Sequence, residues 1–476
     1  MLLVLDEFPT TDLLGRHRAI DAGRFPNFAA LAGDSTWFRN ATTVYDTTFS
    51  AVPAILEGRV HRYRPTPLRP PKQNILSLLA GHGYRVRASA EARNVCQPRY
   101  CGRQRSTRYY LVRSRLARLA GFIDSIKPTR RPTIWFKHVL LPHVPWVYLP
   151  SGKQYIRGFE PPIRGINSAA GAFDPTLEDL AYQRHMLQVA AVDGALGVLL
   201  RRLRQTGLYD RCLLIVVADH GISFRLGETD RRIVTRANVE GIAPVPLFVK
   251  LPHQHRGRVS GTYARNSDVA PTIARVAGVR ITWPTSGHSV FSRALRARHT
   301  VHVGSRQPGV NAVRIGLGAF QSRWTRVIKN THGLFGIGSL ARLYAIGPAR
   351  GVIGRPLAGS GRRLTVGGAR VAGPGRYRAS VLGRAEIRHV SPGARFLPAF
   401  VSGYIRGGGG RRHSLAIAVD GRIVATTRSF FLRGSSREGY AVIVPEESLH
   451  PGRNHVHVLA IGHRGRRLRF RLLAEV

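Results

Sequence analysis

Short apolar runs alternate with longer stretches of helical spacing over the first part of the chain. The clearest run, 213–218, reads Leu-Leu-Ile-Val-Val-Ala, and strand-like runs also occupy 2–5 and 245–250. Apolar, β-branched runs of this length are typical of strands buried on both faces of a parallel sheet. Residues 177–207 carry apolar side chains at helical spacing before the central run. The alternation predicts an α/β fold, a mixed, mostly parallel sheet flanked by helices.

Other segments of this region fit the same interpretation. A helix followed by a strand is predicted for 26–39 and for 74–89, and a strand begins at Ile134. A hydroxyl-rich segment leads into an apolar helix that Gly58 ends, because glycine readily adopts the left-handed conformation. A further helix begins at Asp268, which we interpret as its N-cap.

The pattern changes after about residue 290, where the alternation of strands and helices fades. From about 374 it is purely β, and Asp420-Gly421 between two apolar runs is a strong hairpin signal. We therefore predict an α/β domain over 1–295, a sheet-edge and linker region over 296–373, and a small all-β, sandwich-like domain over 374–476.

The chain is strongly basic. Its 476 residues include 73 lysines and arginines against 26 aspartates and glutamates, a formal net charge of +47. Such a chain attracts anionic partners, including acidic polymers and the membrane surface. Because the basic residues are scattered and no nucleic-acid-binding motif accompanies them, we expect no specific nucleic-acid partner. No apolar run approaches the ~18 residues of a membrane span, and Met1 leads directly into a strand without a visible signal peptide.

Three cysteines bear on the redox environment. Cys96 and Cys101 lie close together in a loop-like segment. Their spacing fits a small disulfide loop better than a zinc knuckle, which needs more ligands nearby. Cys212, at the start of the central apolar run, is most simply an inert core thiol.

The central strand ends in Asp219-His220-Gly221. Open α/β sheets bind their ligands at the carboxyl ends of the strands. An acid and an imidazole at such an end are suitable ligands for a divalent metal ion. The alternative interpretation is an aspartate that caps the next turn and a histidine satisfied by hydrogen bonds.

The first strand also ends in acidic residues, Asp6 and Glu7. Adjacent carboxylates repel each other unless a cation or another partner lies between them. A capped turn is the alternative explanation. The placement of these residues at a strand end makes them candidates for the same site as Asp219.

A third candidate group starts the helix that Gly58 ends, in the segment Thr47-Thr48-Phe49-Ser50. The N-terminus of a helix suits an anion, because its N–H groups are unpaired and its dipole is positive there. A hydroxyl at this point can be a nucleophile if a metal or base activates it. On composition alone, an N-cap is the commoner explanation.

The strand from Ile134 runs into Pro142-His143-Val144-Pro145. Two prolines hold His143 rigidly in a loop at a strand end, which favours a functional role. His138 lies within the strand, and we interpret it as structural.

Taken together, six motifs resemble the sulfatase branch of the alkaline phosphatase superfamily over residues 1–295. They are Val4-Leu5-Asp6-Glu7, Thr48-Phe49 to Leu56-Glu57-Gly58-Arg59, Pro142-His143-Val144-Pro145, Ala218-Asp219-His220-Gly221, Val245-Pro246-Leu247-Phe248-Val249-Lys250-Leu251-Pro252 and Asp268-Val269-Ala270-Pro271-Thr272. The resemblance implies an alkaline phosphatase-like α/β fold. Within this branch, the chain resembles bacterial membrane-associated sulfatase-like proteins, which have a β-rich C-terminal part and a cysteine pair that Cys96 and Cys101 resemble.

The resemblance also implies roles. Asp6, Asp219 and His220, with Glu7 as a further candidate, would hold one divalent metal ion (Mn, Zn, Ca or Mg). A second metal would need an Asp-x-x-x-His motif that we do not find. Thr48, ten residues before Gly58, stands at the position of the nucleophile. His143 resembles the histidine that holds the anionic group of the substrate, and Lys250 matches a strand lysine.

Position 48 departs from sulfatases proper, which carry Cys or Ser followed by x-Pro-x-Arg and oxidise it to formylglycine. Thr48-Phe49-Ser50-Ala51-Val52 excludes that modification and is more like the phosphodiesterases and phosphotransferases of the superfamily. We expect a metal-dependent hydrolase or transferase that acts on phosphate or sulfate esters through Thr48. The anionic ester substrate is expected to be a cell-envelope lipid or polymer. The alternatives are a catalytically inactive envelope scaffold and, from charge alone, a nucleic-acid-binding protein.

A disulfide implies export, so we expect the protein at the cell membrane or in an extracytoplasmic compartment. We also expect that an N-terminal membrane segment is missing from this chain. The sequence leaves the oligomeric state open.

Overall fold

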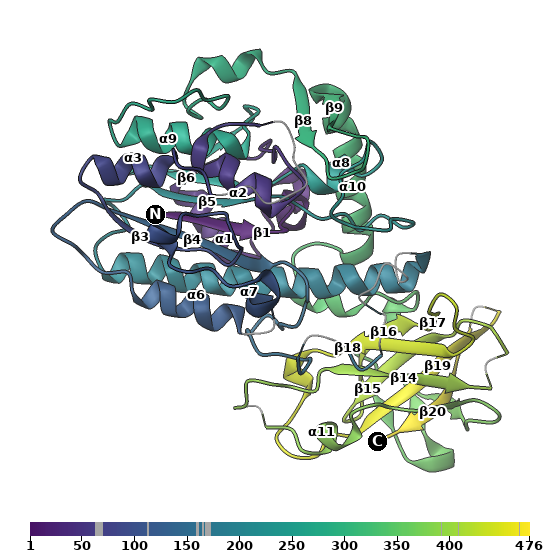
Figure 1. Ribbon diagram of the computed structural model, residues 1–476. Helices are drawn as coiled ribbons and strands as arrows, with labels where there is room; N and C mark the ends of the chain where they lie inside the picture. The colour runs from purple at the N-terminus through teal and green to yellow at the C-terminus, as the bar shows by residue number, and fades with distance from the viewer. Residues whose placement is uncertain are drawn as a thin grey trace. The chain divides into compact units, whose positions relative to one another are not determined.

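The computed structural model of the chain describes residues 1–61, 70–111, 114–158, 161–163, 166, 173–391, 393–407, 409–465 and 467–476. These residues form two compact units (Figure 1). Unit 1 comprises Met1–Val144, Val192–Ser223 and Asp230–His332, and unit 2 comprises Pro145–Ala191, Phe224–Thr229 and Gly333–Val476. Neither unit is one continuous segment of the sequence.

Unit 1 is built on a seven-stranded sheet in the order β3-β4-β1-β5-β6-β2-β7. Among these strands β6 runs against the others, which all share one direction. The bounds are β1 Leu2–Asp6, β2 Thr36–Phe38, β3 Arg85–Ser89, β4 Thr133–Pro142, β5 Leu214–Ala218, β6 Leu247–Lys250 and β7 Arg258–Ser260. The predicted mixed, mostly parallel sheet is confirmed.

Helices cover both faces of this sheet (Figure 1). The helices up to this point of the chain are α1 Pro26–Asp34, α2 Thr48–Glu57, α3 Ile75–Gly81, α4 Pro98–Cys101, α5 Thr107–Leu111, α6 Arg115–Asp124, α7 Pro175–Gln205, α8 Val239–Ile242 and α9 Val269–Val276. On one face, Val4 and Val217 belong to the same buried cluster as Ile55 of α2. On the other, Leu3 and Val216 share a small internal gap with side chains of α6 and α7. Because both faces are covered, the central strands carry uninterrupted apolar sequence. Within the described residues, no helix combines the length and the apolar character needed to cross a membrane.

A hairpin and a long helix follow the sheet region. The hairpin joins β8 Thr300–Gly304 to β9 Ala312–Gly316, and helix α10 spans Leu317–Phe335. Helix α10 lies in the region that the sequence led us to expect as sheet edge and linker. Its buried residues Phe320, Trp324 and Ile328 recur every four residues, which is helical spacing. Polar and glycine residues between these positions dilute the signal in the sequence.

The C-terminal part of unit 2 is a β-rich region of mainly antiparallel strands, as predicted. One sheet has the order β10-β11-β12-β20-β19-β15-β16 and the other has the order β13-β14-β18-β17. The bounds are β10 Leu357–Ala358, β11 Thr365–Val366, β12 Ala369–Ala372, β13 Arg378–Ala379, α11 Arg384–Arg388, β14 Phe400–Arg406, β15 Ser414–Val419, β16 Arg422–Arg428, β17 Phe430–Phe431, β18 Glu438–Ile443, β19 Val456–Arg464 and β20 Arg467–Glu475. Asp420 and Gly421 connect β15 to β16 with φ of 43° and 80°, as a two-residue hairpin turn requires.

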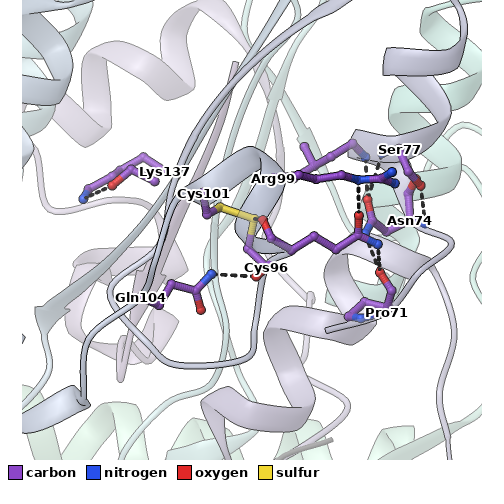
Figure 2. The surroundings of a disulfide bond; sticks show 11 residues. Pro71, Asn74, Ser77, Cys96, Arg99, Cys101, Gln104 and Lys137 are labelled. Atoms are coloured by element: carbon purple, nitrogen blue, oxygen red, sulfur yellow. Dashed lines mark hydrogen bonds between the residues drawn. A yellow bond between two sulfur atoms is a disulfide. The ribbon is translucent and has the colours of Figure 1, made fainter. Parts of the chain in front are cut away.

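The predicted disulfide joins Cys96 to Cys101 at the end of α4 (Figure 2). Hydrogen bonds tie this loop to its surroundings, since Gln104 Nε2 donates to the Cys96 carbonyl and Gln97 Nε2 donates to Lys72 O at 2.8 Å. Cys212 is half-buried and precedes β5, so it is not the fully buried core thiol that the sequence suggested.

Replacing both Cys96 and Cys101 with serine is expected to lower the free energy of unfolding by about 2 kcal/mol, because so short a closed loop restricts the unfolded chain only modestly. Denaturant unfolding of the variant beside the native protein measures this. The variant Cys212→Ser is the control. A loss as small as that of the control would contradict the prediction.

Candidate active site

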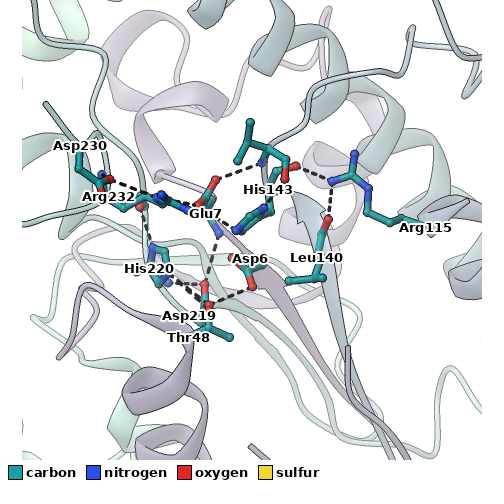
Figure 3. Close-up of polar contacts among 12 residues, drawn as sticks. Asp6, Glu7, Thr48, Arg115, Leu140, His143, Asp219, His220, Asp230 and Arg232 are labelled. Atoms are coloured by element: carbon teal, nitrogen blue, oxygen red, sulfur yellow. Dashed lines mark hydrogen bonds and ion pairs between the residues drawn. The ribbon is translucent and has the colours of Figure 1, made fainter. Parts of the chain in front are cut away.

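Two carboxylates meet at the carboxyl edge of the sheet of unit 1 (Figure 3). Leu5 of β1 lies opposite Ala218 of β5 in a parallel pairing, so the next residues, Asp6 and Asp219, leave the sheet at the same edge. Both side chains are fully buried. The backbone N–H of Glu7 donates to Asp219 Oδ1 at 3.3 Å. The strands therefore bring together acidic residues that lie more than 200 positions apart.

Thr48 is the first residue of α2 and points at this pair. Its hydroxyl donates a hydrogen bond to Asp6 Oδ2 at 3.1 Å, and its Oγ1 lies 3.4 Å from His220 Nε2. The N-cap of the helix is Thr47, whose side chain makes no capping hydrogen bond. The hydroxyl of Thr48 is thus directed into the site, and the capping explanation is wrong for this residue.

His220 is held in one orientation by its own loop. Its Nδ1 donates to the carbonyl oxygen of Gly221 at 2.9 Å, which fixes the ring so that Nε2 faces the Thr48 hydroxyl. Gly221 packs closely, since a Cβ there would lie 2.7 Å from the carbonyl oxygen of Gly241. The glycine lets the loop fold tightly enough to place the imidazole.

His143 lies on the side of Asp6 away from Thr48 and Asp219, and it pairs with Glu7 (Figure 3). Its Nε2 is 3.1 Å from Glu7 Oε1, and its Nδ1 faces the carbonyl oxygen of Val144. The N–H of Val144 donates to Glu7 Oε2 at 3.1 Å. Both ring nitrogens therefore face oxygen atoms, and these contacts fix the orientation of the imidazole.

Arg115 of α6 contacts the backbone of the loop that carries His143. It is completely buried, and its guanidinium donates to the carbonyl oxygens of Leu140, at 2.8 Å, and His143. This role could not be predicted from the sequence, because no local pattern links a helix residue to a loop more than twenty positions away.

We expect Arg115→Lys to lower turnover by about 100-fold, because the shorter lysine side chain would not bring its ammonium to the place where Arg115 Nη1 contacts both carbonyl oxygens, and small displacements of a reacting group have effects of this size. Steady-state kinetics with thermal unfolding of the same samples would measure it. Arg118→Lys is a suitable control, since Arg118 pairs with Glu91 instead. Equal losses in the two variants would show that Arg115 has no specific link to His143.

The donor set fits a divalent metal ion. Potential ligand atoms cluster in two groups, Asp6 with Glu7 and His143, and Asp6 with His138 and Asp219. Asp6 Oδ1 and Asp219 Oδ2 are buried and receive no hydrogen bond from the described residues. Buried carboxylate oxygens without a donor are costly unless a cation satisfies them. His220 lies outside both groups, although its Nε2 is 3.7 Å from Asp219 Oδ2.

The charges in the site are strongly coupled. Burial alone would raise the pKa of Asp6, but the imidazoles of His143, His138 and His220 hold that pKa below its ordinary value. Burial raises the pKa of Asp219, and the negative charge of Asp6 raises it further. Burial would lower the pKa of His220, but the two carboxylates outweigh this effect and raise it. The pair of carboxylates therefore resists carrying two negative charges unless a cation joins them.

Sequence reasoning missed two side chains at this edge and misplaced a third. His138 lies 3.1 Å from Asp6 Oδ2, and Arg232 Nε lies 3.7 Å from Glu7 Oε1. Lys250 instead lies at the end of β6, opposite Leu214 at the start of β5, and donates to the carbonyl oxygen of Tyr209. Because β6 runs antiparallel to β5, the last residue of β6 lies at the edge of the sheet opposite to the edge where Asp219 lies.

The family model described as Sulfatase matches residues 2–279. Among curated proteins, arylsulfatase K of Xenopus laevis is 32% identical over 102 residues, which are 21% of this chain and 18% of that protein. Arylsulfatase K of Danio rerio is 30% identical over 119 residues, 25% of this chain and 22% of that protein. The matched stretch thus spans about a fifth of these relatives.

Solved structures similar to this chain include a phosphonate monoester hydrolase of Agrobacterium radiobacter, with a TM-score of 0.49 and 17% identity, covering 65% of this chain and 81% of that one. A putative sulfatase from Bacteroides thetaiotaomicron has a TM-score of 0.48 and 12% identity, covering 70% and 90%.

Proposed function

We propose that this chain, which belongs to the sulfatase family, is a metal-dependent hydrolase or transferase of phosphate or sulfate esters with Thr48 as its nucleophile. One observation carries the proposal. The Thr48 hydroxyl lies within 3.1 Å of Asp6 and 3.4 Å of His220, at the N-terminus of α2. A hydroxyl in that position contacts the candidate metal ligands and lies at the N-terminus of a helix, where an anionic group is stabilised.

Asp6, Asp219 and His220 would hold the metal ion. When bound, a divalent ion lowers the pKa of a nearby hydroxyl and neutralises charge on the oxygens of the ester. The two carboxylate oxygens without donors, and the position of His220 Nε2 3.7 Å from Asp219 Oδ2, support this assignment. Glu7 turns toward His143 and Arg232, so we assign it chiefly to positioning His143.

The reaction follows from the side chains around Thr48. The Thr48 hydroxyl, whose pKa a bound metal ion would lower, gives its proton to water, and Oγ1 forms a bond to phosphorus or sulfur while the ester bond to the alcohol breaks. His143, held in place by its contacts with Glu7 and Val144, would donate a proton to the departing oxygen or bind a non-bridging oxygen. Water or an acceptor alcohol then breaks the bond to Thr48 and releases the product.

A phosphoester is the favoured substrate class, because a threonine cannot be converted to the formylglycine of sulfatases proper. The net charge of +47 suits an anionic lipid or polymer of the cell envelope. The disulfide supports an oxidising compartment outside the cytoplasm.

The test uses the purified protein with Mn²⁺, Zn²⁺ or EDTA and three nitrophenyl esters, a phosphodiester, a phosphomonoester and a sulfate. We expect turnover of a phosphoester that needs metal and stops with EDTA. Turnover of the sulfate ester alone would contradict the preference for phosphorus. A folded protein without turnover of any ester would contradict the enzyme and favour a binding or scaffolding role.

A further inference from the structure

We infer that His138 is a further ligand of the metal ion, in addition to the residues assigned above. The inference rests on the proposed function, because it concerns the same metal site. Three observations carry it: the position of His138 on its strand, its contacts, and the distances between neighbouring donor atoms.

His138 lies on the same face of β4 as two buried apolar residues that precede it. Side chains two positions apart on a strand point the same way, and the preceding residues on this face, Ile134 and Phe136, belong to the buried cluster under α2 and α3. His138 itself is completely buried. An apolar side chain would fill this place without the cost of desolvating an imidazole. The polar group therefore needs a compensating interaction in the interior.

The interaction that the structure provides is with the carboxylate pair. His138 Nε2 lies 3.1 Å from Asp6 Oδ2, and both fall in the same potential metal-binding group as Asp219. The other ring nitrogen, Nδ1, is buried without a hydrogen-bond partner among the described residues. A single hydrogen bond to Asp6 would leave Asp6 Oδ1 and Asp219 Oδ2 unsatisfied. A cation shared by the three side chains would satisfy both oxygens and the Nε2 lone pair together.

The distances agree with a shared ion. Two ligand atoms that bind one tetrahedral zinc ion at about 2.0–2.1 Å lie about 3.3 Å from each other. Around Asp6 Oδ2, His138 Nε2 and Thr48 Oγ1 each lie at 3.1 Å, and Thr48 Oγ1 lies 3.4 Å from His220 Nε2. His138 thus approaches the carboxylate from β4 as closely as the nucleophile does from α2. The site becomes one of two carboxylates and two imidazoles.

The test measures metal binding rather than turnover. Metal-free wild-type protein, His138→Gln and His138→Leu are titrated with Zn²⁺ by calorimetry, with His302→Gln on β8 as a histidine control. The leucine variant restores an apolar side chain to the strand face and retains the fold if glutamine does not. We expect both His138 variants to bind Zn²⁺ more than about 100-fold more weakly, beyond the about 10–100-fold that loss of an outer partner of a ligand causes.

Pulsed electron paramagnetic resonance of the Cu²⁺-loaded proteins then counts coordinated imidazoles. We expect the His138 variants to show one imidazole fewer than wild type. Weaker binding with an unchanged imidazole count would make His138 a positioning residue and overturn the inference. Unchanged affinity would overturn it as well, while leaving the proposed function standing. Wild-type protein that binds no metal would overturn both.

Discussion

Replacing Thr48 with alanine is expected to lower phosphoester turnover by at least about 1,000-fold without unfolding the protein. Loss of a nucleophile that acts together with its activating groups removes most of the rate enhancement. The side chain is small and forms no helix cap, so the free energy of unfolding changes by no more than about 1 kcal/mol. Steady-state kinetics and thermal unfolding of the same preparation measure both quantities.

Thr47→Ala is the matched control for this prediction. It removes a neighbouring hydroxyl that is equally buried but makes no capping hydrogen bond. Thr48→Ser, which keeps a hydroxyl, is expected to retain measurable turnover. If Thr48→Ala kept wild-type activity, or if Thr47→Ala lost as much, the nucleophile would have to be sought elsewhere.

Asp219→Asn is expected to abolish metal-dependent turnover and at the same time to stabilise the metal-free protein. The oxygen that accepts hydrogen bonds from the backbone N–H groups of His220 and Glu7 is retained in asparagine. The other oxygen, which has no donor, is replaced by an N–H group that no longer repels Asp6. Removing a buried like-charge pair in this way raises the free energy of unfolding by roughly 1–3 kcal/mol.

Calorimetric scans with and without Zn²⁺ would show a crossover. Metal stabilises the native state of wild type by about 2.7 kcal/mol at a concentration 100 times its Kd, and the variant lacks most of this gain. The variant should therefore melt above wild type in EDTA and below it in saturating metal. A variant that melts below wild type in EDTA would show that the carboxylates do not strain the metal-free site.

Much of the site could be predicted from the sequence because its residues lie at strand and helix ends that local patterns mark. Asp6 and Asp219 follow apolar runs, and Thr48 starts a helix that a glycine ends. The parallel pairing of β1 with β5 then brings the carboxylates together. These are consequences of strand periodicity and of the direction in which neighbouring strands run.

The features of the site that could not be predicted depend on which side chains face each other across the sheet. His138 lies inside a strand, and its role depends on the pairing of β4 with β1, where Val4 lies opposite His138 and a register shift follows Leu5. Lys250 was placed by motif alone, whereas the antiparallel direction of β6 carries it to the other edge. Such cross-strand relations are not contained in local hydrophobic patterns.

The measurement that tests the central claim most directly is the stereochemical course of the reaction at phosphorus. A phosphodiester made chiral at phosphorus by isotopic substitution is turned over, and the configuration of the product is determined. Attack by Thr48 followed by attack of water or an alcohol involves two in-line displacements, each of which inverts the centre, so the account predicts overall retention. Inversion would mean that water or the acceptor attacks the ester directly, and it would contradict Thr48 as the nucleophile.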